Sequence, residues 1–228
     1  MTTFVLLHGA YQGGWIWKHV GERLTAAGHQ VYRPSLDGCG DRRQHLRPGI
    51  TTETHGAEIA ALLVAEDLTD VAMVGTSSGG MVLCRAAELV PERVGRVSFV
   101  DALALFSGEK LGDIVQRSSA LSDDLATSPP KEDIATRLFG DLEPEVRDWA
   151  LDRTTPHPIA ALNEPITLAS FWDAAWAAQV IYCNQSSNPP VAHQRRTAEA
   201  LNASWHELDT GHYPMLSMPD ELSHLLQS

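Results

Sequence analysis

The chain has 228 residues, a length typical of a single domain or of one domain with a modest insertion. Hydrophobic residues make up 43% of it and charged residues 20%, which predicts a full hydrophobic core and excludes intrinsic disorder. The net charge of −12 argues against nucleic acid or an anionic membrane surface as a partner, because both attract clustered Lys and Arg.

Three widely spaced cysteines, Cys39, Cys84 and Cys183, form no Cys-x-x-Cys pair, so the sequence predicts neither a zinc site nor a disulfide framework. Free thiols are typical of a reducing compartment. The first residues lack the basic segment and long apolar run of a signal peptide, and no run reaches the length of a membrane span. We therefore expect a cytoplasmic protein.

Up to residue 100, short apolar runs alternate with helical patterns. Thr52 is expected to cap the second helix, and a Gly-rich, charged loop should cover residues 35–50. Repeated strand–helix alternation predicts a parallel sheet with helices on both faces. The predicted strands are 4–7, 31–34, 71–74 and 94–100, and the predicted helices are 15–27, 52–68 and 78–90.

The alternation breaks after residue 101. Residues 102–178 contain helical pieces separated by prolines and are rich in Trp, Phe and Leu, so we expect a helical insertion and not a second sheet domain. Alternation then resumes, with strands at 179–183 and 204–208 and helices at 191–201 and from Pro219 onward. The predicted core is therefore 1–101 and 179–228.

A serine flanked by glycines lies between the predicted strand 71–74 and helix 78–90, in the run Gly75-Thr76-Ser77-Ser78-Gly79-Gly80. Gly-x-Ser-x-Gly at a strand–helix junction is typical of a nucleophile elbow, a strained turn that projects the serine hydroxyl. Glycines lack a Cβ and so let strand and helix approach closely. Ser78 lacks a glycine two residues upstream, so Ser77 is the predicted nucleophile. The alternative is a merely structural glycine-rich turn.

A serine nucleophile needs an oxyanion hole and a base. The amide of Ser78 should supply one oxyanion donor, and the loop after the first strand, at Ala10, the other. The base should be a histidine after the last strand, which His212 satisfies. His8 is expected to order the first loop through hydrogen bonds.

These segments together resemble the α/β-hydrolase superfamily, and within it the branch of small esterases that includes plant methyl esterases, hydroxynitrile lyases and bacterial homologues. The resemblance implies a six-stranded core, a helical cap formed by 102–178, and no metal or organic cofactor. Similar lyases have Thr in place of Gly9 and Lys in place of Tyr213, so the esterase interpretation is favoured. The residues that carry the resemblance are 8–17, 35–42, 75–81, 91–93, 100–102 and 211–215.

The acid of the triad is not where most of this family has it. The loop 184–190, after the strand 179–183, contains no carboxylate. Asp101 follows the strand after the elbow helix, a position at which some similar lactonases and dehalogenases carry their acid. We therefore predict a triad of Ser77, His212 and Asp101. Two alternatives remain open: Asp101 only caps the start of the insertion, or Asn184 or Asn188 assists a Ser–His dyad.

The predicted activity is hydrolysis of a carboxylic ester or lactone of a small molecule through an acyl-enzyme. Tyr11, Gln12, Trp172 and Trp176 are expected to line the substrate pocket, although each also suits ordinary core packing. The alternatives are a lactonase or cyclase of natural-product metabolism, and a non-catalytic protein that binds a small ligand on the same scaffold. The sequence also leaves a homodimer open.

Overall fold

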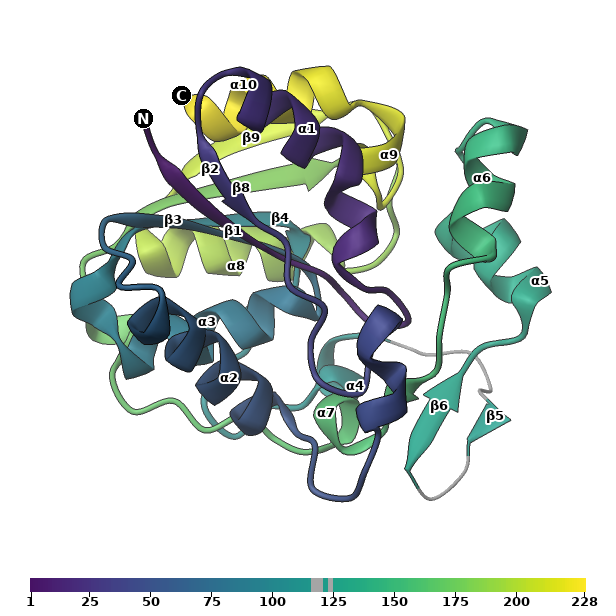
Figure 1. Ribbon diagram of the computed structural model, residues 1–228, viewed down its shortest axis with the longest axis horizontal. Coiled ribbons are helices and arrows are strands. Elements are labelled where there is room, and N and C mark those ends of the chain that lie inside the picture. Colours follow the sequence, from purple (N-terminus) through teal and green to yellow (C-terminus); the bar gives the residue numbers. More distant parts are fainter. Residues whose placement is uncertain (116–120, 123–124) are drawn as a thin grey trace.

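The computed structural model describes residues 1–115, 121–122 and 125–228, and a six-stranded sheet lies at its centre (Figure 1). Every pair of neighbouring strands in this sheet runs parallel, in the order β2-β1-β3-β4-β8-β9. The predicted parallel sheet is therefore confirmed. Its strands are β1 (Thr3–Leu7), β2 (Gln30–Tyr32), β3 (Val71–Ser77), β4 (Val94–Ala102), β8 (Ala177–Cys183) and β9 (Ser204–Leu208).

Helices cover both faces of the sheet (Figure 1). One face carries α1 (Lys18–Ala26), α9 (Pro214–Ser217) and α10 (Pro219–Gln227), and the other carries α2 (Thr52–Ala65), α3 (Gly79–Leu89) and α8 (Val191–Leu201). Short 3-10 turns, η1 (Gly14–Trp17) and η3 (Pro91–Arg93), precede α1 and β4. None of the helices among the described residues is long and apolar enough to cross a membrane.

The alternation of side chains along β1 shows how the sheet divides the core. Phe4 and Leu6 point into the hydrophobic cluster beneath α1 and α10, whereas Val5 and Leu7 point into the one beneath α2, α3 and α8. All four side chains are fully buried, because successive residues of a strand face opposite sides and both sides are covered. This explains why the sequence shows β1 as a continuous apolar run.

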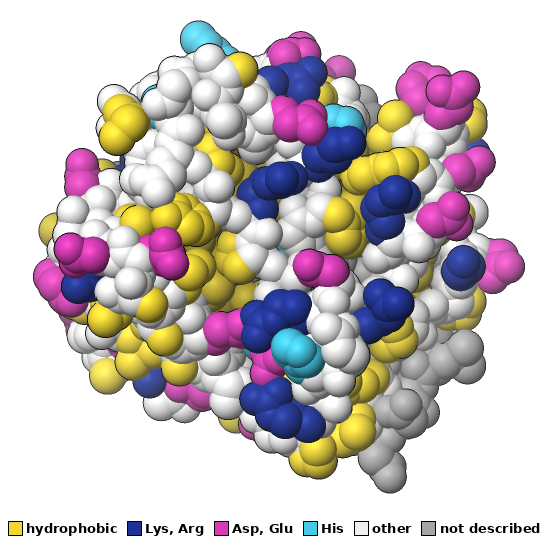
Figure 2. Space-filling model, in the orientation of Figure 1, with side chains coloured by type: hydrophobic (Ala, Val, Ile, Leu, Met, Phe, Trp, Pro, Cys, Tyr) yellow, Lys and Arg dark blue, Asp and Glu magenta, His cyan; other side chains and the backbone are white. Residues whose placement is uncertain are grey.

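Two local predictions between residues 35 and 52 were wrong. The cap of α2 is Thr51, whose hydroxyl accepts from the Thr54 amide while the Thr54 hydroxyl accepts from the Thr51 amide. Thr52 instead donates to the carbonyl of Ala161. The loop 35–50 contains a 3-10 helix, η2 (Gly40–His45), which is tied down because Asp37 accepts hydrogen bonds from Arg42, His45 and Arg47. Figure 2 shows a group of Lys or Arg side chains with a histidine and acidic side chains on the face in view.

Residues 102–178 were predicted to be a helical insertion, but they are not purely helical. Three short strands form an antiparallel sheet within them. Prolines explain this: a residue before proline is pushed toward extended backbone, and Ser128 and His157, both in strands, precede Pro129 and Pro158. The segment contains the strands β5 (Leu121–Ser122), β6 (Ala126–Ser128) and β7 (His157–Pro158) and the helices α4 (Leu111–Ile114), α5 (Lys131–Asp133), η4 (Ile134–Leu138), α6 (Pro144–Leu151), α7 (Ala160–Asn163) and η5 (Phe171–Asp173).

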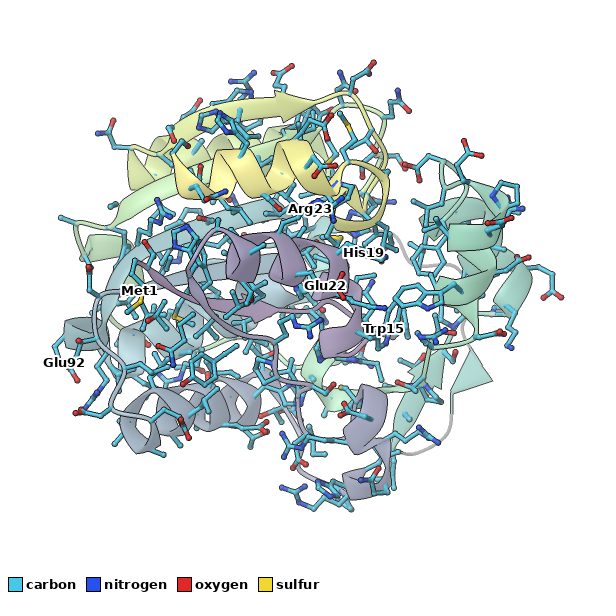
Figure 3. The ribbon with its side chains drawn as sticks, turned by 45° about the horizontal axis from the view of Figure 1, so that its top comes forward. Met1, Trp15, His19, Glu22, Arg23 and Glu92 are labelled. Carbon is cyan, nitrogen blue, oxygen red and sulfur yellow. The ribbon has the colours of Figure 1, made fainter. Side chains whose placement is uncertain are left out.

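An aromatic contact joins α6 to the core. The ring centroids of Trp15, in η1, and Trp149, in α6, lie 5.5 Å apart in an edge-to-face arrangement. The guanidinium of Arg153 lies 4.3 Å from the centroid of Trp149. Figure 3 shows Trp15 on the side of the core that faces α6.

Glu88, in α3, holds the far end of the segment where the chain returns to the core. One of its carboxylate oxygens accepts from the amides of Ala169, Ser170 and Phe171, at 2.6, 2.5 and 3.0 Å, and the other accepts from Arg85 at 2.6 Å. Burial by itself raises the pKa of Glu88, but these donors outweigh it and leave the pKa below its ordinary value. The ionised carboxylate is therefore part of the fold.

Replacing Glu88 by Ala leaves three backbone amides without their acceptor and is expected to cost about 2–3 kcal/mol of unfolding free energy at pH 7. Because the folded pKa is lowered, this contribution is present above about pH 4.3 and is lost as the pH falls through the folded value. Urea unfolding at pH 7 and at acid pH measures it. Glu92→Ala, at an exposed position, is the control. Equal stabilities of the two variants at pH 7 contradict the assignment.

Candidate active site

Ser77 is the last residue of β3 and lies in a strained turn. Its φ is +52°, a left-handed conformation that is uncommon for a residue with a side chain. Ser78 follows as the N-cap of α3, which begins at Gly79. The sequence Gly-x-Ser-x-Gly has therefore folded as a sharp strand-to-helix turn, the geometry expected for a nucleophile elbow.

The two glycines of the elbow are required by close backbone contacts. A Cβ at Gly75 would lie 2.8 Å from the carbonyl oxygen of Gly79, and one at Gly79 would lie 2.6 Å from that of His8. Real Cβ atoms essentially never make such contacts with backbone. The expectation that glycine lets strand and helix approach closely is confirmed at Gly75, whereas the close contact of Gly79 is with the backbone of Leu7 and His8.

The loop after β1 packs directly against the elbow. A Cβ at Gly9 would lie 2.6 Å from the Cβ of Ser77, so the backbone that leads to Ala10 lies beside the serine. Tyr11 has a φ of +68°, which turns the chain sharply after Ala10. Gln12 is 1% exposed, and its side-chain oxygen accepts from the Gly9 amide at 3.2 Å. Gln12 thus stabilises the loop by a hydrogen bond within it.

His8 also supports this loop, as predicted. The ring is fully buried, its Nε2 accepts from the Leu36 amide at 3.0 Å, and its Nδ1 lies 2.8 Å from the carbonyl oxygen of Gly9. One nitrogen must accept and the other donate, so the ring is neutral. Burial lowers the pKa of His8 to about 4, which keeps it neutral at physiological pH.

Asp101 occupies a β-bulge in β4, beside the elbow. Thr76 pairs with Val100 and Ser77 pairs with Ala102, so Asp101 is the extra residue between two pairs. Its φ is +43°, and its side chain has no solvent exposure. The strand therefore continues past its predicted end at residue 100, and the bulge turns the carboxylate out of the regular alternation.

This bulge brings the Asp101 carboxylate to His212. Oδ2 of Asp101 lies 2.5 Å from Nδ1 of His212, which is 8% exposed. Asp209 contacts Gln185 instead, so it is Asp101 that faces the imidazole. Asn188, in the loop 184–190, lines the adjoining pocket.

Sequence reasoning missed two residues that hold this pair. Asp141, from the segment 102–178, accepts from the Gly211 amide at 2.8 Å and so anchors the turn before His212. Gln194, in α8, donates to Oδ1 of Asp101 at 2.6 Å. No local signal identifies either residue, because Gln194 is 93 residues from Asp101 in the chain and Asp141 is 70 residues from Gly211.

Ser77 and His212 open on the same pocket, of about 780 Å³ including space open to solvent. The structure has no hydrogen bond between the Ser77 hydroxyl and the imidazole, and such bonds are often long before substrate binds. Most of the wall is apolar. The other lining residues are Ala10, Tyr11, Leu103, Leu111, Val115, Pro129, Asp133, Arg137, Leu138, Leu162, Asn188, Pro189 and Tyr213.

A second pocket of about 900 Å³, again including open space, also reaches His212 and is lined mainly by polar residues from the segments 136–141 and 185–188. The imidazole is therefore accessible from an apolar side and a polar side. No cluster of three or more potential metal ligands (His, Cys, Asp or Glu) occurs in the described part of the chain.

Three residues expected in the substrate pocket do not line it. The Gln12 side chain is hydrogen-bonded to the Gly9 amide and to the Tyr213 hydroxyl. Trp172 donates its indole hydrogen to the Leu105 carbonyl, and Trp176 donates its indole hydrogen to the Phe171 carbonyl. Both indole rings also pack against the ring of Phe171. Their side chains serve the packing of the returning chain, the alternative that the sequence allowed. Of the four predicted residues, Tyr11 alone is in the pocket wall.

Residues 4–225 match the model of the alpha/beta hydrolase family, and the chain therefore belongs to this family. Within the family, its relatives include the predicted branch of plant methylesterases and hydroxynitrile lyases.

Similarity extends over nearly the whole chain in several relatives. The carbendazim hydrolyzing esterase of a Nocardioides species is 28% identical, covering 99% of this chain and 98% of that protein. Methylesterase 7 of Arabidopsis thaliana is 27% identical, covering 98% and 94%. An extracellular alpha/beta-hydrolase from a Paenibacillus species has the same fold, with a TM-score of 0.86, 20% identity, and coverage of 99% and 98%.

Replacing Gly9 by Ala should displace the first loop from Ser77, because the new Cβ would overlap the serine Cβ. We expect kcat/KM for an ester substrate to fall on the order of 100-fold, as small displacements of reacting groups do. Gly112→Ala is the matched control, since its new Cβ meets no described atom within 4 Å. Steady-state kinetics and a thermal unfolding midpoint for both variants provide the measurement. Unchanged activity of Gly9→Ala would show that this contact is not needed.

Proposed function

We propose that the protein is a carboxylic ester hydrolase in which Ser77, His212 and Asp101 form the catalytic triad. The observation that carries this proposal is the buried 2.5 Å contact between Asp101 Oδ2 and His212 Nδ1 beside the strained Ser77. An imidazole held at Nδ1 by a carboxylate leaves Nε2 free to take a proton from serine. The family membership and the esterase names of its relatives support the same reaction.

In the proposed mechanism, Ser77 Oγ attacks the ester carbonyl carbon and its proton passes to Nε2 of His212. The amides of Ala10 and Ser78 stabilise the oxyanion. When the tetrahedral intermediate collapses, the ester C–O bond breaks and the alkoxide leaves with the proton from His212. Water then gives a proton to His212 and attacks the acyl-enzyme, which releases the carboxylic acid and restores Ser77.

The walls of the pocket support a small-molecule ester with an apolar group. Tyr11, Leu103 and Leu162 line the space next to Ser77, and such surfaces favour apolar groups through burial. Residues 102–178 supply Leu111, Leu138 and other parts of the wall, so we propose that this segment acts as the cap and selects the substrate. Lactones are cyclic esters and fall within the same reaction.

A cytoplasmic location is also proposed. All three cysteines are free and buried, as suits a reducing compartment.

A fluorophosphonate probe tests the nucleophile, because it reacts with a serine that a base activates. We expect covalent labelling of the wild-type protein at Ser77 and none in Ser77→Ala. Ser98→Ala, at a buried serine in β4 that accepts a hydrogen bond from Gln179, is the control and should still be labelled. A wild-type protein that resists the probe would favour a non-catalytic ligand-binding role.

The acid is tested by Asp101→Asn, which keeps the shape of the side chain but removes its charge. We expect kcat to fall by about 10²–10⁴, because the imidazolium loses its stabilising partner and the correct tautomer. Asp209→Asn, in the exposed turn before His212, should stay close to wild type. Activity of Asp101→Asn close to that of wild type would exclude the acid role and leave a Ser–His dyad.

A further inference from the structure

We propose that Gln194 is a positioning residue for this reaction, which holds the Asp101 carboxylate so that its second oxygen faces His212. The inference rests on the proposed function, since it concerns the same triad. Gln194 does not touch the substrate pocket. It acts through Asp101 and through the loop that carries Pro189.

The geometry of the amide supports this role. Gln194 is 1% exposed, and its Nε2 lies 2.6 Å from Asp101 Oδ1 and 3.1 Å from the carbonyl oxygen of Pro189. Both neighbours can only accept a hydrogen bond when Asp101 is ionised. The amide must therefore point its NH2 group at them, because the reversed orientation would bring oxygen against two oxygens.

Gln194 is the main donor to the oxygen of Asp101 that His212 does not use. Among the described residues, the one other donor to Oδ1 is the Cys183 amide, at 3.4 Å. A carboxylate with no solvent exposure depends on protein donors to remain ionised and fixed in one rotamer. Without Gln194, Asp101 would keep the long contact to Cys183 and could rotate away from the imidazole.

Packing alone does not explain a glutamine at this position. Its Oε1 is buried and has no hydrogen-bond partner among the described residues, which is unfavourable for stability. An apolar side chain of the same length would avoid that cost. The gain must lie in what the NH2 group does, which is to orient the acid.

The second hydrogen bond links the acid to the pocket wall. Pro189 and its neighbour Asn188 line the pocket that Ser77 and His212 share, and the Pro189 carbonyl is held by the same NH2 group that holds Asp101. One buried amide thus fixes both the acid and one side of the substrate space. Loss of the Gln194 amide should therefore change kcat through Asp101 and KM through the pocket wall at Pro189.

Several other titratable or charged groups lie around the Asp101–His212 pair. Burial raises the pKa of the Cys183 thiol and of the Tyr213 hydroxyl, and the nearby charges of Asp101 and Asp141 raise both further. Both groups therefore stay neutral through the working range. Asp141 accepts from the Gly211 amide next to His212, and Asp133 and Arg137 line the same pocket as His212. Among the described residues, the Gln194 side chain hydrogen-bonds to Asp101 and Pro189 and to none of these other groups, so a change in the acid limb of the activity profile on replacing Gln194 reports on the Asp101–His212 pair.

Gln194→Met tests the proposal, because Met has a similar length and cannot donate. We expect kcat to fall about tenfold and the acid-side midpoint of the kcat/KM profile to move up by about one pH unit. The midpoint moves up because the NH2 group of Gln194 stabilises the unprotonated Asp101–His212 pair, so its loss favours proton uptake by the pair. Gln179→Met is the matched control, a buried glutamine in β8 whose NH2 donates to Ser98 Oγ at 2.9 Å, and it should leave rate and profile unchanged.

Gln194→Glu keeps the shape of the side chain, and it provides the test if the Gln194→Met variant does not fold. Two carboxyl groups at this distance must share a proton, so this variant should lose activity as the pH rises and that proton leaves. A wild-type rate and profile in either folded variant overturns the positioning role. If the wild-type protein neither hydrolyses esters nor reacts with the fluorophosphonate probe, the proposed function itself fails, which is a separate outcome.

Discussion

The arrangement of the site depends on one constraint, the burial of the Asp101 carboxylate at the end of β4. A charge without solvent exposure must be met by hydrogen-bond donors from the protein. Three parts of the chain supply contacts to it: His212 after β9, the Cys183 amide in β8, and Gln194 in α8. The strands β4, β8 and β9 are neighbours in the sheet, so the topology makes this convergence of distant segments geometrically feasible.

Close backbone contact on the other side of the site sets the position of the serine. The first loop, the end of β3 and the start of α3 approach so tightly that a Cβ at Gly9, Gly75 or Gly79 would overlap a neighbour. Ser77 lies within this packing and has a positive φ, a strained conformation that persists only where the surrounding structure holds it. Two different features of the backbone therefore set the positions of the proposed nucleophile and acid: close glycine contacts for Ser77 and a β-bulge for Asp101.

Much of the fold could be read from residue patterns, because it follows from local periodicity. The helix 191–201 and the strand 204–208 were predicted with the bounds that the structure gives. Patterns failed between residues 102 and 178, where pairing of β6 with β7 joins residues about 30 apart. The same region shows why Trp172 and Trp176 were assigned to the substrate pocket: composition reveals that an indole is buried, but not against what it packs.

The sequence by itself determined the family-like elbow at Ser77, the late histidine at position 212 and the absence of a carboxylate from the loop 184–190. These are features of single short segments, and local chemistry is enough to recognise them. Only the tertiary structure decided that Asp101 faces His212 across 111 residues of chain, and that Gln194 and Asp141 hold the pair. Such contacts depend on which strands become neighbours and on one extra residue in β4. Neither the strand order nor the bulge can be recognised from the residues next to it in the sequence.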